Sequence, residues 1–120
     1  MKLKNLVPML WTNDLDGSIA FYREMLGFEC VNRAEGWASL QKDAVELMLS
    51  LPNAHERFDK IQFTGSFYFH PENVEELWRG VRDKATVVYP LEDFDYGMRE
   101  FAIRDNNGYI LQFGQEIDPG

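Results

Sequence analysis

The sequence predicts an α+β fold built from two successive βαβββ modules. Hydrophobic residues switch from a helical spacing of three and four to a strand spacing of two, and the order strand, helix, three strands occurs twice in 120 residues. This length suits one domain with a hydrophobic core and is too short for two. We expect a single domain over residues 1–120, with module one at 5–51, a connector at 52–62 and module two at 63–116.

The first module opens with a short apolar strand and an amphipathic helix. Leu6–Thr12 is the expected strand, and Pro8 favours an initial or edge position for it. Asp14–Leu26 has apolar residues at helical spacing, an aspartate able to cap its first turn, and Gly27 directly after its end. Three alternating strands separated by short polar turns follow, at Phe28–Arg33, Trp37–Gln41 and Val45–Leu51.

The second module repeats this order. Thr64–His70 alternates as a strand, and a helix is expected to open at Pro71 or Glu72. An acidic loop, Glu92–Gly97, separates the next two strands, and Asp105–Gly108 is a strong turn signal in the last hairpin. The three closing strands are expected at Thr86–Leu91, Met98–Arg104 and Tyr109–Gln115.

Composition excludes several classes of function. Twenty acidic and twelve basic side chains give a net charge of -8 and a pI near 4.7, which disfavours binding to nucleic-acid phosphates. No apolar run approaches the roughly 20 residues that cross a bilayer. The single cysteine, Cys30, cannot form an intrachain disulfide and is expected to be a small buried thiol. We expect a cytoplasmic protein without nucleic-acid or membrane partners.

The strands indicate a cavity. On each strand, residues of one parity are strongly apolar and should pack under the helices, whereas the other parity mixes aromatic, methionine and polar side chains, as in a small-molecule site. A dimer interface or a second core accounts for such a face equally well. If Leu40 pairs with Val45 and Arg104 with Tyr109, the second face is lined by seven candidate ligand-binding residues: Trp11, Trp37, Glu46, Tyr68, Arg99, Phe101 and Gln112.

Single polar residues give few signs of catalysis. Glu46 either orients a ligand amine or pairs with a basic group such as Arg99. His70, directly before Pro71, is expected to end a strand. No nucleophile–base–acid set, phosphate loop or Cys/His metal cluster is present in the sequence, so no catalytic residue, metal ligand or cofactor is expected.

Two stretches carry a resemblance to a known family. Residues 14–28, DLDGSIAFYREMLGF, and residues 97–109, GMREFAIRDNNGY, followed by LQFG at 111–114, resemble the vicinal oxygen chelate superfamily of glyoxalases, bleomycin resistance proteins and dioxygenases. The resemblance spans the chain. It implies two paired βαβββ modules with curled mixed sheets, helices on the outer face, and a homodimer.

The resemblance also implies where a metal would bind. Enzymes of the superfamily hold a divalent metal with His and Glu residues at inward positions of the first and fourth strands of each module. The corresponding positions here are Val7, Glu46, Ser66 and Gln112, of which Glu46 alone is an anionic ligand. One carboxylate does not hold a catalytic metal.

This departure points to the bleomycin resistance branch. We expect a metal-independent, homodimeric protein that binds and sequesters a small drug or metabolite, cationic and aromatic in character, without altering it. An acidic face with aromatic walls attracts and stacks such a ligand. The alternative is a metal-dependent lyase or dioxygenase with a reduced site around Glu46 and His70.

Overall fold

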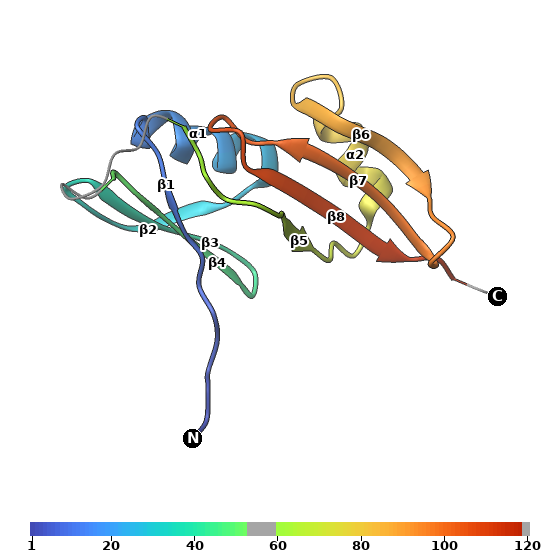
Figure 1. Ribbon diagram of the computed structural model, residues 1–120, viewed down its shortest axis with the longest axis horizontal. Coiled ribbons are helices and arrows are strands. Elements are labelled where there is room, and N and C mark those ends of the chain that lie inside the picture. The colour runs from blue at the N-terminus through green and yellow to red at the C-terminus, as the bar shows by residue number, and fades with distance from the viewer. Residues whose placement is uncertain (53–59, 119–120) are drawn as a thin grey trace. The chain divides into compact units, whose positions relative to one another are not determined.

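The computed structural model describes residues 1–52 and 60–118 (Figure 1). Residues 53–59 of the expected connector, with His55, lie outside the described residues. The chain divides into two compact units, Met1–Lys60 and Ile61–Gly120. Each unit contains a strand, a helix and three further strands in that order, so the predicted α+β class with two βαβββ repeats is confirmed.

The first unit forms a four-stranded mixed sheet with one helix. The sheet order is β1-β4-β3-β2, with β1 parallel to β4 and the other neighbours antiparallel. The element bounds are β1 Met9–Trp11, α1 Leu15–Leu26, β2 Glu29–Ala34, β3 Trp37–Lys42 and β4 Val45–Ser50. The first strand is shorter than expected; it begins after Pro8, which has no amide proton to donate and bonds to β4 through its carbonyl alone.

Local sequence signals set the bounds of α1. The Asp14 side chain accepts a hydrogen bond from the Gly17 amide at 2.9 Å, which satisfies one of the free amides of the first turn. Gly27 ends the helix in the left-handed conformation, with φ of 76°. The helix buries Ile19 and Tyr22 against one side of the sheet. The core residues that the sheet contributes are Leu10, Ala38, Leu40, Leu47 and Leu49.

The second unit has the same topology. Its sheet order is β5-β8-β7-β6, and β5 runs parallel to β8. The bounds are β5 Phe67–Phe69, α2 Val74–Val81, β6 Thr86–Asp93, β7 Met98–Arg104 and β8 Ile110–Glu116. The helix begins later than expected because Asn73, not Pro71 or Glu72, caps it by accepting from the Glu76 amide. Strand β6 extends into the expected acidic loop, which leaves a turn at 94–97.

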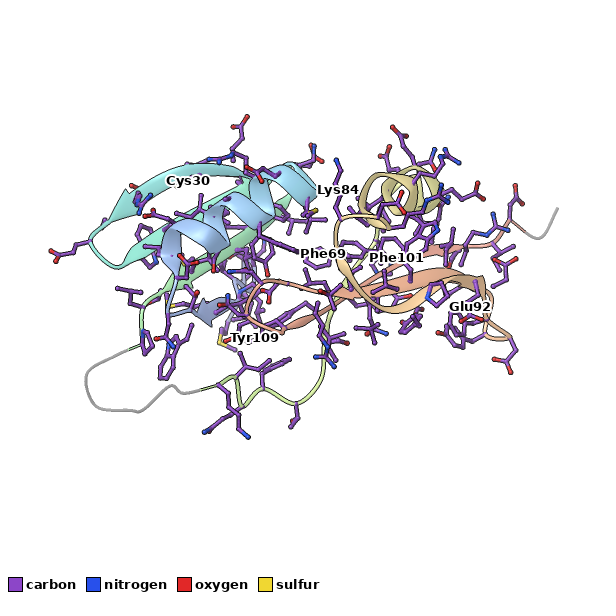
Figure 2. All side chains as sticks on the ribbon, turned by 90° about the horizontal axis from the view of Figure 1, so that it is seen from above. Cys30, Phe69, Lys84, Glu92, Phe101 and Tyr109 are labelled. Carbon is purple, nitrogen blue, oxygen red and sulfur yellow. The ribbon has the colours of Figure 1, made fainter. Side chains whose placement is uncertain are left out.

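The core of the second unit lies between its sheet and α2. Phe101 is 0% exposed, with its ring 5.0 Å from Phe113 and 5.1 Å from Trp78 of α2. Figure 2 shows Phe101 on the helix-covered side of the sheet. Val74 and Val81 of α2 are buried. Burial of one such side chain contributes about 1.5–3 kcal/mol to folding.

The expected pairing in the last hairpin is wrong by one residue. Arg104 pairs with Ile110 rather than with Tyr109. The Asp105 carboxylate accepts from the amides of Asn107 and Tyr109, both at 2.9 Å, and this turn takes in one more residue than assumed. A slip of one residue moves every side chain of β7 to the opposite face.

Cys30 also differs from expectation. It lies on the edge strand β2, whose six residues are all exposed, so the thiol is not buried (Figure 2). Within the described residues, the two helices are too short and too polar to cross a membrane.

Candidate functional site

On the first sheet, the face opposite α1 carries two tryptophans. Trp11 of β1 and Trp37 of β3 both pair with Ser50 of β4, so the two rings flank one serine on the same face. Both side chains are half-buried. The expected partner of Leu40 was wrong by two residues, because it pairs with Leu47, but a shift of two keeps every side chain on its predicted face.

Glu46 lies on this face as a half-buried carboxylate. Its Oε2 accepts a hydrogen bond from Ser39 Oγ at 3.1 Å. Met9 and Met48 pair across β1 and β4 one step further along the face. The face therefore presents an oriented carboxylate next to the methionine pair, with the two tryptophans further along β4 at Ser50. Such a surface suits an apolar ligand with a positive charge.

On the second sheet, the corresponding face is organised by a buried carboxylate. Glu100 of β7 is 2% exposed. Tyr68 and Tyr96 donate to its Oε1 at 2.7 and 3.0 Å, while Tyr89 and Gln112 Nε2 donate to its Oε2, the latter at 3.2 Å. We call these five residues the Glu100 cluster. They come from all four strands and the β6–β7 turn, so hydrogen bonds to one carboxylate connect every strand of this sheet.

Glycine at position 114 makes the cluster possible. Gly114 of β8 pairs with Glu100 on β7, and Tyr68 lies on the other side of β8. The Tyr68 side chain must therefore cross over residue 114 to reach the carboxylate. A Cβ at this position would lie 1.9 Å from Tyr68 Oη, far inside contact distance, so any larger residue displaces the tyrosine.

Gln112 joins the cluster to Ser66. Its amide nitrogen donates to Tyr89 Oη at 2.8 Å as well as to Glu100. Its amide oxygen accepts from Ser66 Oγ. Each polar end of Gln112 is thus engaged by the protein.

The cluster fixes the charges of its members. Burial by itself raises the pKa of Glu100, but the hydrogen bonds from the three tyrosines and Gln112 outweigh it and hold that pKa below its ordinary value. Burial raises the pKa of Tyr89 to about 12; the bond from Gln112 opposes this rise, and donation to the carboxylate adds to it. Burial and the bond to Glu100 likewise raise the pKa of Tyr68 and of Tyr96. Glu100 is therefore ionised and the phenols neutral near pH 7.

The expected positions of Arg99 and Phe101 on this face are wrong. Both lie on the helix-covered side, as the corrected pairing of β7 requires. Phe101 is a core residue, and Arg99 binds Asp93 at 2.7 Å and Glu75 of α2. Arg99 therefore pairs with acidic groups of its own unit, and these contacts replace the expected alternative of a Glu46–Arg99 pair.

Glu100, Tyr89 and Tyr96 were not predicted from the sequence as site residues. Glu100 was assigned to the wrong face by the pairing error. The signal that finds it is the spacing of the two large apolar residues of β7: Phe101 and Ile103 take the helix-covered side and leave Glu100 and Ala102 for the other face. Tyr89 lies between two register shifts of β6, so the alternation of residues does not predict which face of the sheet its side chain is on.

The four positions at which the family resemblance implies metal ligands do not fit a metal ion. Val7 has no donor atom, Ser66 and Gln112 bond each other, and Glu46 accepts from Ser39. Among residues 1–52 and 60–118, no group of three or more His, Cys, Asp or Glu residues is placed to hold a metal. Of the reduced site considered as an alternative, Glu46 lies in the first unit and His70 in the second.

An open hollow of about 290 Å³ lies elsewhere on the first unit. Its lining mixes both signs of charge, and no predicted site residue contributes to it. It is lined by Gly27, Glu29, Val31, Gln41, Lys42 and Asp43.

The two βαβββ units, each with aromatic and polar side chains on the free face of its sheet, have the architecture expected from the family resemblance. The sequence model of the Glyoxalase/Bleomycin resistance protein/Dioxygenase superfamily matches residues 5–113. The chain belongs to this superfamily.

Similar proteins agree with this assignment. The bleomycin resistance proteins of Geobacillus stearothermophilus and Staphylococcus aureus are each 26% identical to this chain, over 92% of it and 96% of the relative. A glyoxalase/bleomycin resistance protein/dioxygenase from Nocardioides has a TM-score of 0.81 at 17% identity, covering 100% of this chain and 88% of that one. TioX from Micromonospora sp. ML1 has a TM-score of 0.77 at 21% identity, covering 95% and 99%. These structures share the fold.

Replacing Gly114 tests the crossing of Tyr68. We expect Gly114→Ala to lower the free energy of unfolding by about 1–3 kcal/mol, because the added methyl group overpacks against Tyr68. Gly80→Ala is the matched control: a Cβ there meets nothing within 4 Å, and alanine in a helix gains up to about 1 kcal/mol. Urea unfolding measures both. A Gly114→Ala protein as stable as the parent would contradict the crossing.

Tyrosine ionisation tests the cluster at alkaline pH. A phenol whose folded pKa is raised stabilises the fold below its unfolded value of about 10. That stability is lost as pH rises from about 10 towards about 12, the folded value for Tyr89. The difference in phenolate absorbance between the parent and Tyr89→Phe reports this group. We expect its midpoint near 12, whereas a midpoint near 10 with the fold intact would contradict the cluster.

Proposed function

We propose that this protein binds and sequesters a small cationic, aromatic compound without a metal ion and without altering the ligand. The observation that carries the proposal is the presence, on each sheet face opposite its helix, of a carboxylate together with aromatic side chains. Glu46 shares its face with Trp11 and Trp37, which flank Ser50 further along β4, and in the second unit Glu100 accepts a hydrogen bond from Tyr68. A carboxylate and aromatic rings on one face favour a cation with a flat aromatic part.

Two further findings support the proposal. The curated relatives are named bleomycin resistance proteins, which fits sequestration of a drug. The family's metal positions hold donors that are absent or already bonded to protein groups. We propose Trp11, Trp37, Glu46, Tyr68 and Gln112 as ligand contacts, in a cytoplasmic homodimer.

A titration with metal-free bleomycin tests the proposal. We expect saturable quenching of tryptophan fluorescence and recovery of the drug unchanged. Trp11→Phe and Trp37→Ala should each weaken binding, the latter about tenfold, because a stacked ring contributes up to about 1.5 kcal/mol. Trp78→Phe is the control, because Trp78 packs on Phe101 under α2 and should leave the affinity unchanged.

Metal analysis separates this function from a metal enzyme. The protein is incubated with nickel, cobalt, manganese and zinc, desalted and analysed for metal per chain. The proposal expects no stoichiometric retention. About one ion held per chain, lost in Glu46→Gln, would overturn metal independence and favour the lyase or dioxygenase alternative. Sedimentation of the same sample measures the dimer.

A further inference from the structure

The carboxylate of Glu100 has no free hydrogen-bonding position. A carboxylate offers about four acceptor sites, and Glu100 receives two donors on each oxygen from the other members of its cluster. A ligand therefore cannot donate a hydrogen bond to Glu100 unless it displaces a tyrosine or Gln112. An approaching N–H group would lose water without gaining this acceptor.

The charge of Glu100, by contrast, is not balanced. Its four donors are neutral groups. Across the described part of the chain, no lysine, arginine or histidine forms an ion pair with it. The neighbouring Arg99 binds Asp93 and Glu75 on the other face. A full negative charge thus lies just beneath the surface of this sheet.

Aromatic rings cover that charge. Tyr68 and Tyr96 are 40% and 61% exposed, although both hydroxyls bind Glu100. Phe94 stacks on Tyr96 with ring centroids 5.4 Å apart, and it meets Tyr89 edge-on at 5.7 Å. Because the hydroxyls are directed at the carboxylate, the rings are what a ligand meets. A phenol that donates to a carboxylate has a more electron-rich ring, which strengthens its attraction for a cation.

We propose that the Glu100 cluster, with Phe94, binds cations that lack N–H donors, namely quaternary ammonium groups and N-alkylated heteroaromatic rings. Such a cation is attracted by the buried charge of Glu100, contacts the faces of the rings and needs no hydrogen-bond acceptor. A primary ammonium of equal charge brings three N–H donors that must keep their water or remain unpaired, and each unpaired donor weakens binding. This inference rests on the proposed function and names the charged part of its ligand.

The direct test compares two probes that differ in N-methylation. Benzyltrimethylammonium and benzylamine, which is protonated at pH 7, are titrated into the full chain at low ionic strength and followed by calorimetry. We expect the quaternary probe to bind about tenfold more tightly, from desolvated cation–π contact. Equal affinities, a preference for benzylamine, or no binding of either probe would overturn the inference.

Tyr96→Phe tests whether Glu100 itself sets the preference between the two probes, because a purely structural role of Tyr96 would leave the ratio of their affinities unchanged. The variant keeps the ring and removes one donor, so Glu100 Oε1 gains a free acceptor position. Benzylamine should then gain affinity, and the preference for the quaternary probe should narrow or reverse. Because Tyr96 is largely exposed in the 94–97 turn, the variant should fold. An unchanged ratio of affinities would contradict the assignment of the site to Glu100.

Two matched variants distinguish the effect of the Glu100 charge on probe binding from the effect of the protein's net charge. Glu100→Gln and Glu76→Gln each remove one negative charge, and Glu76 lies on α2, outside the cluster. We expect the first to abolish binding of the quaternary probe and the second to leave it within about twofold. If Glu100→Gln fails to fold, the ratio of probe affinities in Tyr96→Phe tests the inference instead. Bleomycin that still binds while both probes fail would leave the proposed function standing and overturn this inference alone.

Discussion

A buried carboxylate has to be solvated by the protein, and this constraint organises the second half of the molecule. Removing Glu100 from water is unfavourable unless its oxygens are hydrogen-bonded. The donors come from β5, β6, β8 and the β6–β7 turn, so the hydrogen bonds to this carboxylate link all four strands of the sheet. Gly114 is needed for the same hydrogen bonds, because the Tyr68 side chain passes over it to reach Glu100. The charge itself stays on the face opposite α2.

The two units share a topology but use it differently. In each, a capped helix covers one side of the sheet, and apolar side chains of one parity form the core. The first unit places Trp11, Trp37 and an oriented Glu46 on the other side. The second places phenols around a buried Glu100 there. The repeated topology thus supplies the scaffold, while the two free faces carry different side chains.

Local signals made most of the fold predictable from the sequence. Asp14 and Gly27 determine the ends of α1 through a side-chain cap and a left-handed glycine, and both were readable. The free face of the first sheet was also predicted, because the error in pairing Leu40 was an even number of residues. The second face was not, because Asp105 bonds two amides of its own turn and lengthens the hairpin by one residue. That single residue places Glu100, rather than Phe101, on the face opposite α2.

The cation-attracting character of this face depends on Glu100 staying ionised beneath the tyrosine rings. A pH titration of the carboxyl carbons by NMR, with Glu100 identified by its loss in Glu100→Gln, measures this directly. Four donated hydrogen bonds lower the folded pKa, so we expect protonation below the ordinary value of about 4.3. The stability that this ionised group contributes would be lost as pH falls through its folded pKa. Protonation of Glu100 above its ordinary value would contradict a charged, cation-attracting face.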